Sequence, residues 1–372
     1  MKARISRRMK ILLLLALSMT LAGCVPTTGE RSEILMGTVV TLKAEGGDAQ
    51  TAVDETFNRI AELEENIRAD AKRIEDAAGK EFVPVSPEVF EILETAQIFN
   101  GLTGGAFDVT CGAAVELWGI GTDKARIPTD AELVAVKNLV GANHLHLRDG
   151  AAYLDLRGVK LNLGGIAKGY GVDLARKIFN RCGVKSGLID FGTSTIYAVG
   201  KKRIGIKNPS APSELAAIVE LENAALSTSG DYEKFLIADN RRYPHIIEPK
   251  TCAPVDNGIS SVSVVVEGTV ENCATVADIL STAAFVLGEE RAETFIEAIK
   301  LPAEIIFADW QKKCAPFRHK HIFYLAPVTK CQSCQSEPSS FVIKIFAIRT
   351  PSIALTLKRK PFHSRTSPTL GM

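Results

Sequence analysis

Charge is distributed so unevenly along the 372-residue chain that it restricts a folded domain to the middle segment. Residues 1–23 carry five Lys or Arg and no acidic residue, and residues 24–309 carry 28 Lys or Arg against 42 Asp or Glu. Residues 310–372 carry 11 Lys or Arg against one Glu, and they lack the apolar periodicity of the middle segment. We therefore expect one domain over 24–309, flanked by two basic segments of a different nature.

The amino terminus has the pattern of an export signal. Five basic residues precede an apolar stretch, 11–21, that is too short to span a membrane. Small residues then precede Cys24, as in a lipobox, where the Cys thiol is acylated and becomes the new amino terminus. The alternative is an ordinary signal peptide with a chance Cys. The pattern predicts a lipoprotein signal peptide over 1–23 and an exported protein whose acylated Cys24 anchors it on the extracytoplasmic side of the membrane.

The other basic segment, 310–372, contains three His, three Cys and scattered Pro. This abrupt change predicts an atypical tail that is either disordered or translated in a shifted reading frame. The acidic middle segment has no excess of Lys and Arg, which argues against a dedicated nucleic-acid-binding protein. The presence of only one long apolar run excludes a polytopic membrane protein.

Periodicity within the middle segment predicts an α+β fold. Alternating, β-branched stretches such as 37–42 and 261–266 predict strands. Apolar residues at helical spacing over 50–67 predict an amphipathic helix, and the apolar stretch 275–287 predicts a buried one. A hairpin is expected over 145–156, around Asp-Gly. We expect mixed, largely antiparallel sheets with packed helices.

Four segments carry residues suited to phosphate or metal chemistry. Glycines in 161–173, at an expected strand-to-helix junction, allow a ligand to approach the backbone, although tight turns also use glycine. The hydroxyl-rich segment 227–232 predicts a turn that binds phosphate or ribose oxygens, or a plain turn. His245 lies among strand residues, where a lone His is more often structural. Asp278 and Thr282 share one face of a buried helix, where the carboxylate binds a hard cation or caps a backbone.

The order and spacing of these segments resemble the ApbE family, the FAD:protein FMN transferases, over residues 36–287. The blocks that carry the resemblance are Met36-Gly37-Thr38, Gly105-Ala106-Phe107-Asp108, Trp118-Gly119, Gly164 to Asp173, Gly205-Ile206-Lys207-Asn208-Pro209, Ser227 to Tyr232, His245 to Pro249 and Ala277 to Ala283. Jointly these blocks are specific. The lipobox is also common in this family.

The resemblance implies an ApbE-like fold and a role for each matching position. The FAD-binding positions are Met36, Ala106, Phe107, Asp108, Asn162, Lys168 and Ile247. The Mg²⁺ ligands are the Gly165 carbonyl and the side chains of Asp278 and Thr282, with Ser281 as a further member. His245 matches a position important for transfer, where it is expected to accept the proton of the acceptor hydroxyl.

The implied activity is Mg²⁺-dependent transfer of FMN from FAD to a Thr hydroxyl, with release of AMP. The implied partners are exported or membrane redox proteins that carry a Thr flavinylation motif. Two alternatives remain: an FAD pyrophosphatase that yields FMN and AMP, or an inactive flavin-binding lipoprotein. Three departures from the family pattern are Cys252, where Gly is common, the short segment 70–79, which lacks the Asn usual near the end of the early helical region, and the absence of a closing strand after residue 309. The first predicts a strained turn.

Overall fold

The computed structural model describes residues 27–192, 194–209, 211–299 and 301–308, together with strand backbone at 318–319, 322–325 and 342–344. The expected signal peptide and Cys24 lie outside the described residues, as does most of the expected tail. Among the residues that the structure describes, no helix is both long enough and apolar enough to cross a membrane.

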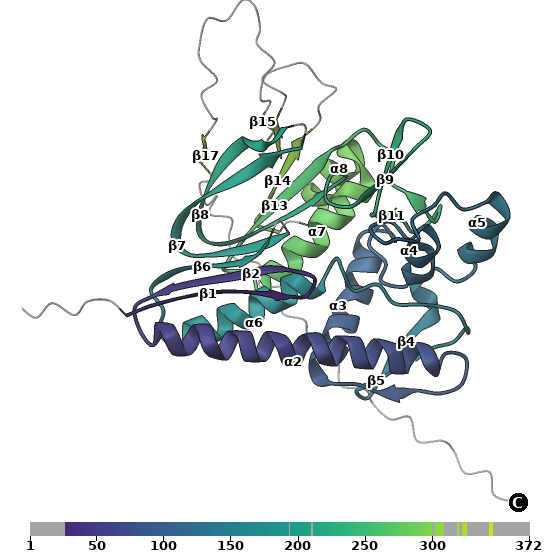
Figure 1. Ribbon diagram of the computed structural model, residues 1–372, viewed down its shortest axis with the longest axis horizontal. Helices are drawn as coiled ribbons and strands as arrows, with labels where there is room; N and C mark the ends of the chain where they lie inside the picture. Colours follow the sequence, from purple (N-terminus) through teal and green to yellow (C-terminus); the bar gives the residue numbers. More distant parts are fainter. Residues whose placement is uncertain are drawn as a thin grey trace, which may run out of the picture.

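A ten-stranded sheet forms the larger part of the molecule (Figure 1). Its path runs β1-β2-β6-β7-β8-β13-β14-β16-β15, and β17 pairs with β8. Neighbours are antiparallel except in the pairs β14–β16 and β8–β17. The strands are β1 (Thr28–Leu35), β2 (Thr38–Glu45), β6 (Ser186–Phe191), β7 (Thr195–Asn208), β8 (Ala211–Gly230), β13 (Ser261–Glu267), β14 (Ala303–Ala308), β15 (Arg318–His319), β16 (Ile322–Leu325) and β17 (Val342–Lys344).

Three small sheets lie beside the large one. They are formed by β3 (Val83–Pro84), β4 (Leu145–Arg148) and β5 (Ala151–Leu154), by β9 (Phe235–Ala238) and β10 (Arg241–Pro244), and by β11 (Ile247–Glu248) and β12 (Ala253–Pro254). The short helices of this region are α4 (Gly112–Trp118), α5 (Asp130–Lys137) and the 3₁₀ turn Ala142–His144. Figure 1 shows α4, α5 and β9 to β11 on one side of the large sheet.

The longer helices pack on the large sheet and on one another. They are α2 (Ala49–Asp76), α3 (Pro87–Leu102), α6 (Ala167–Arg181), α7 (Cys273–Leu287) and α8 (Glu289–Ile299). Helix α2 covers β1 and α6, and α7 contacts α6, β8 and β13. Because α7 is covered on several sides, almost all of its residues are buried, which explains why its sequence is apolar nearly all round.

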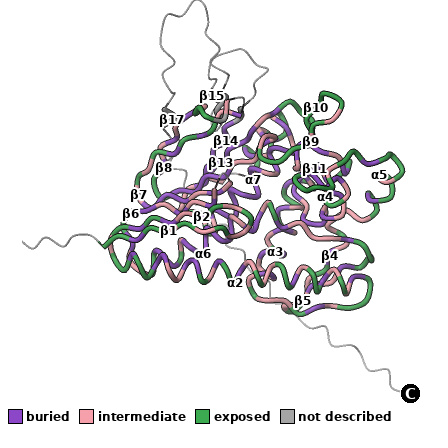
Figure 2. The backbone as a smooth tube through the Cα atoms, in the orientation of Figure 1, coloured by how far each residue is buried: buried purple, intermediate pink, exposed green. Residues whose placement is uncertain are grey.

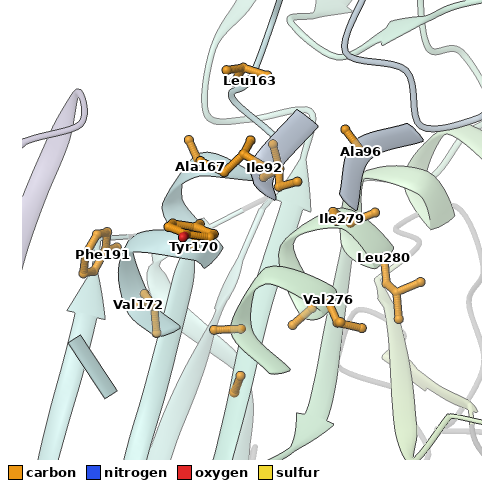
Figure 3. Close-up of a cluster of buried hydrophobic side chains, with 14 of the residues drawn as sticks. Ile92, Ala96, Leu163, Ala167, Tyr170, Val172, Phe191, Val276, Ile279 and Leu280 are labelled. Atoms are coloured by element: carbon orange, nitrogen blue, oxygen red, sulfur yellow. The ribbon is translucent and has the colours of Figure 1, made fainter. Parts of the chain in front are cut away.

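The main core fills the space between these helices and the sheet. Figure 3 shows Tyr170 and Val172 from α6 and Val276 and Ile279 from α7 in one cluster with side chains from α3. Exposure is concentrated on the outer surface of α2, on α5 and on the β9–β10 hairpin (Figure 2). The core therefore fixes α6 against α7, and this junction positions the candidate site.

The expected α+β class is confirmed, and so is the hairpin between β4 and β5, which turns at Asp149 (φ 50°) and Gly150 (φ 76°). Cys252 has φ 58°, so the expected positive φ at this turn is also confirmed. Two expectations need correction. Residues 227–230 belong to β8, so only Asp231 and Tyr232 of the expected segment 227–232 lie in a turn. The structure also pairs β16 with β14, although the sequence pattern predicts no closing strand after residue 309.

Candidate active site

The Asp278 carboxylate lies at the junction of α6, α7 and β8. The backbone amide of Gly169 donates a 2.9 Å hydrogen bond to Oδ2, and the hydroxyl of Ser227 donates a 3.1 Å hydrogen bond to Oδ1. Only 2% of Asp278 is exposed, and both of these hydrogen-bond partners are neutral. Each carboxylate oxygen has a second lone pair, so the group can still bind a cation.

Four hydroxyl groups, of Ser227, Ser229, Ser281 and Thr282, lie around Asp278. Ser281 and Thr282 donate to the backbone carbonyl of Asp278, at 3.0 Å and 3.2 Å. The Ser229 hydroxyl lies 3.0 Å from Ser281 Oγ and 3.4 Å from Thr282 Oγ1. Since Ser227 and Ser229 are two residues apart on β8, both face α7. Helix and strand together form one cluster of oxygen atoms.

Gly165 brings the backbone of the glycine-rich loop against this cluster. A Cβ atom added at Gly165 would lie 3.0 Å from Thr282 Oγ1 and 3.1 Å from Phe107 Cε2. Glycine therefore permits a closer approach than another residue would allow. This arrangement places three elements in contact, namely the loop before α6, helix α7 and the segment after α3.

The donor set suits a hard cation. Its side-chain atoms are one carboxylate and several hydroxyls, with no thiolate or imidazole among them, and such oxygen ligands favour Mg²⁺ over softer metals. A buried carboxylate with neutral partners is costly, and a bound cation lowers that cost. Within the described ranges, no three His, Cys, Asp or Glu side chains gather as a metal site. One protein carboxylate still fits Mg²⁺, which commonly takes substrate phosphates and waters as its other ligands.

The glycine-rich loop holds two of the expected FAD-binding residues. Asn162 Oδ1 accepts a 2.9 Å hydrogen bond from the Gly164 amide, so the side chain fixes the turn into α6. Lys168 Nζ donates a 2.5 Å hydrogen bond to the Gly164 carbonyl. This ammonium group stands at the amino-terminal end of α6, where it adds positive charge to backbone amides that favour phosphate.

The segment 106–108 is fixed by its own hydrogen bonds. Ala106 and Phe107 are buried, and Asn100 Nδ2 donates a 2.9 Å hydrogen bond to the Phe107 carbonyl. Asp108 Oδ1 accepts from both the amide and the hydroxyl of Thr110, at 2.8 Å and 2.6 Å. The Phe107 ring thus presents a rigid apolar surface beside Gly165.

Met36 occupies an unusual backbone conformation. It has φ 52° and is followed by Gly37 at φ 71°, so both central residues of the two-residue turn between β1 and β2 have positive φ. Methionine is rare in such turns, where Asn-Gly is preferred. A Cβ atom added at Gly171 would lie 3.2 Å from Met36 Sδ, so the side chain reaches the first part of α6.

His245 lies between β10 and β11 and is fixed by one carbonyl group. The Lys234 carbonyl oxygen accepts a 3.0 Å hydrogen bond from the His245 amide and lies 3.1 Å from ring atom Nδ1. A carbonyl can only accept, so Nδ1 carries the proton and Nε2 keeps a free lone pair. Burial lowers the pKa of His245, and the positive charges of Lys234 and Lys168 act in the same direction. A neutral imidazole with an available Nε2 can accept a proton.

The structure brings together several of the residues that the sequence singled out. Asp278, Ser281, Thr282, Gly165 and Phe107 form one contiguous group. The positive charge of Lys168, near the start of α6, acts to lower the pKa of His245. Met36 is connected with the site only by the contact of its side chain with Gly171 of α6.

Ile247 is placed differently from the other expected FAD-binding residues. It is 5% exposed and belongs to a separate apolar cluster with Trp118 and Cys252. Sequence reasoning also missed Ser227 and Ser229 as individual site residues. Their alternation on one strand face is a signal for this placement, but a run of hydroxyl residues is also typical of a turn.

The sequence is similar to that of proteins of one known family. The chain matches the model of the ApbE family over residues 36–307. It is 32% identical over 315 residues to an FAD:protein FMN transferase of Vibrio cholerae, covering 79% of this chain and 92% of that protein. It is 31% identical over 293 residues to an FAD:protein FMN transferase of Treponema pallidum, covering 70% of this chain and 79% of that protein.

Solved structures show the same fold. An ApbE protein from Thermotoga maritima superposes with a TM-score of 0.68 at 28% identity, over 76% of this chain and 94% of that one. A flavin transferase ApbE from Vibrio cholerae gives a TM-score of 0.66 at 30% identity, over 75% of this chain and 93% of that one.

Proposed function

The chain belongs to the ApbE family and is an FAD:protein FMN transferase, and on this premise we propose that it uses Mg²⁺ and a threonine acceptor. The proposed metal ligands are the side chains of Asp278 and Thr282 and the Gly165 carbonyl. Ser281 is proposed as a further hydroxyl ligand. The proposed acceptor is a Thr hydroxyl of an exported or membrane redox protein that carries a flavinylation motif.

The proposed reaction exchanges one P–O bond for another. The acceptor hydroxyl oxygen forms a bond to the FMN-side phosphorus of FAD, and the bond from that phosphorus to the bridging oxygen breaks. AMP leaves with the bridging oxygen and its electron pair. The hydroxyl proton passes to Nε2 of His245, whose Nδ1–H stays bonded to the Lys234 carbonyl.

Residues around the site orient the diphosphate and stabilise its charge. Lys168 and the first amides of α6 supply positive potential to the phosphate oxygens. Bound Mg²⁺ would neutralise negative charge that develops on those oxygens during transfer. Phe107, packed against Gly165, keeps water from one side of the loop.

One observation carries the metal assignment. The buried Asp278 carboxylate has neutral hydrogen-bond partners and stands within a cluster of hydroxyl oxygens. Such a group is better accommodated with a divalent cation than without one.

We also propose that the protein is an exported lipoprotein held at the membrane by acyl chains on Cys24. The basic segment, the short apolar stretch and the small residues before Cys24 support this assignment. The first strand begins at Thr28, so only a few residues would separate the anchor from the domain. The domain would then lie near membrane redox proteins on the same side.

The test compares Asp278→Asn with wild-type protein in two assays. The first incubates enzyme, FAD and an unflavinylated redox protein with increasing Mg²⁺ and measures covalent FMN by mass spectrometry. The second measures the melting temperature in the same Mg²⁺ series. We expect Asp278→Asn to abolish transfer and the Mg²⁺-dependent stabilisation, because the neutral amide loses the charge that binds the ion.

A matched control is Asp173→Asn. Asp173 is also buried, and it accepts hydrogen bonds from the Thr275 amide at 2.7 Å and the Thr275 hydroxyl at 2.8 Å. Its substitution should lower the melting temperature but preserve the response to Mg²⁺. Equal Mg²⁺ responses in wild-type and Asp278→Asn proteins would contradict the metal assignment. Free FMN and AMP without labelled acceptor would instead indicate hydrolysis.

A further inference from the structure

We propose that Thr195 is a positioning residue for the metal site, because its hydroxyl directs the single hydroxyl proton of Ser227 to the Asp278 carboxylate. This inference rests on the proposed Mg²⁺ site and adds a residue that is not among the proposed ligands. Thr195 lies on β7 and acts on Asp278 only through Ser227.

Thr195 and Ser227 face each other across two neighbouring strands. Thr195 is the first residue of β7 and pairs directly with Ser227 of β8, and their hydroxyl oxygens lie 3.0 Å apart. Both residues are fully buried, so bulk water does not compete for either hydroxyl. Because threonine is β-branched, its χ1 angle is restricted in a strand. The Thr195 hydroxyl is therefore held beside Ser227.

The direction of each hydrogen bond follows from the number of protons. Ser227 carries one hydroxyl proton, and the carboxylate oxygen Oδ1 of Asp278, 3.1 Å away, can only accept. In the 3.0 Å pair of Thr195 and Ser227, the donor is therefore Thr195. Ser281 also donates to the Ser227 oxygen, at 3.3 Å, so both of its lone pairs have a donor. This arrangement leaves the Ser227 proton directed to Asp278.

Loss of the Thr195 hydroxyl would give the Ser227 proton a second direction. The Ser281 hydroxyl can accept as well as donate, so Ser227 could then donate to Ser281. Asp278 would keep the Gly169 amide on Oδ2 but lose the Ser227 donor on Oδ1, which lets the carboxylate turn. Mg²⁺ requires near-ideal octahedral geometry, whereas Ca²⁺ accepts a more variable arrangement of ligands. The Thr195 hydroxyl should therefore matter more for Mg²⁺ than for Ca²⁺.

The experiment measures metal affinity by isothermal titration calorimetry of the full mature chain with FAD present and no acceptor. Mg²⁺ and Ca²⁺ are titrated separately. Thr195→Val keeps the size of the side chain but removes the hydroxyl. We expect it to raise Kd for Mg²⁺ by about tenfold and Kd for Ca²⁺ by less than about threefold. Thr195→Ser restores the hydroxyl and should recover the wild-type Kd for both ions.

A double variant tests whether Thr195 acts through Ser227. Ser227→Ala removes the donor to Oδ1, so it should raise Kd for Mg²⁺ at least as much as Thr195→Val does. The double variant Thr195→Val with Ser227→Ala should bind Mg²⁺ no more weakly than Ser227→Ala alone, because the second change removes no further contact with Asp278. Effects on Kd that add in the double variant would contradict the proposal.

Thr228→Val is the matched control. The Thr228 hydroxyl lies 2.7 Å from that of Ser263 on β13, and Thr228 occupies the face of β8 opposite Ser227. This variant should lower the melting temperature but keep the wild-type Kd for Mg²⁺. The proposal is overturned if Thr195→Val binds Mg²⁺ as the wild type does, if Thr195→Ser fails to restore binding, or if Thr228→Val weakens binding equally. A wild-type chain that binds no Mg²⁺ would overturn the metal assignment itself, and this inference with it.

Discussion

The backbone amide of Gly169 donates a 2.9 Å hydrogen bond to Oδ2 of Asp278, and this contact joins α6 to α7 at the site. A Cβ atom at residue 169 would lie 2.5 Å from the Ala274 carbonyl oxygen and 2.8 Å from Asp278 Cβ. Glycine at this position therefore has two effects. It permits the close approach of the two helices, and it presents the amide to the carboxylate.

Gly169→Ala should lower both stability and metal binding. The added methyl group meets backbone atoms that cannot move alone, so α6 and α7 must separate, at a cost of about 1–3 kcal/mol. Urea unfolding should measure this loss, and the Mg²⁺ dependence of transfer should shift to higher concentration. Gly101→Ala is the control. Gly101 lies near the end of α3, and nothing lies within 4 Å of a Cβ atom added there. An unchanged Gly169→Ala protein would refute the packing argument.

The helical half of the site is predictable from the sequence, because its pattern is local. Asp278 and Thr282 are four residues apart in an apolar helix, so their shared face follows from helical geometry alone. The strand half is not predictable in this way. Ser227 contacts Asp278 only because β8 packs against α7. That packing depends on the strand order of the whole sheet, which no local pattern encodes.

His245 shows a second reason for the limits of sequence analysis. The residues from 243 to 247 have strand propensity, and the sequence predicts one strand over them. The structure ends β10 at Pro244 and begins β11 at Ile247, so His245 occupies the break between them. Its ring position depends on the Lys234 carbonyl, which belongs to a tertiary contact that no local pattern records.

Met36→Asn should separate stability from FAD binding. Asn tolerates positive φ better than Met, so the turn between β1 and β2 should become more stable by up to about 1 kcal/mol. The substitution also removes the thioether that approaches Gly171, so KM for FAD should rise. Thermal unfolding and steady-state kinetics measure the two effects. Gains in both stability and FAD affinity would show that the strained Met36 has no role in flavin binding.

Gly165→Ala should impair metal use with little loss of stability. The new methyl group would press on Thr282 Oγ1 at 3.0 Å and on Phe107 Cε2 at 3.1 Å, both of which are side-chain atoms that can shift slightly. Displacement of the Thr282 hydroxyl should raise the Mg²⁺ concentration for half-maximal transfer by about tenfold. Titration of activity with Mg²⁺ at fixed FAD measures this change. An unaltered midpoint would place Thr282 outside the metal site.

The pH profile of transfer should report the environment of His245. Burial is the largest influence and lowers the pKa of His245 below its usual 6.5, so the neutral form persists into mildly acidic solution. The rate of FMN transfer should therefore fall only as pH drops through this lowered pKa. The acidic limb of the kcat profile is then expected below pH 6.5. Measurements from about pH 5 to 8 with saturating FAD and acceptor locate that limb.

His245→Gln should remove the acidic limb and lower kcat by about 10²- to 10⁴-fold, because the amide cannot accept the hydroxyl proton.

The lowered pKa of His245 also has a consequence for folding. The folded state disfavours the imidazolium, so the stability that His245 contributes is present above pH 6.5 and lost as pH falls toward the lowered pKa. A limb above pH 6.5 in wild-type protein, or one that survives in His245→Gln, would assign the proton transfer to another group.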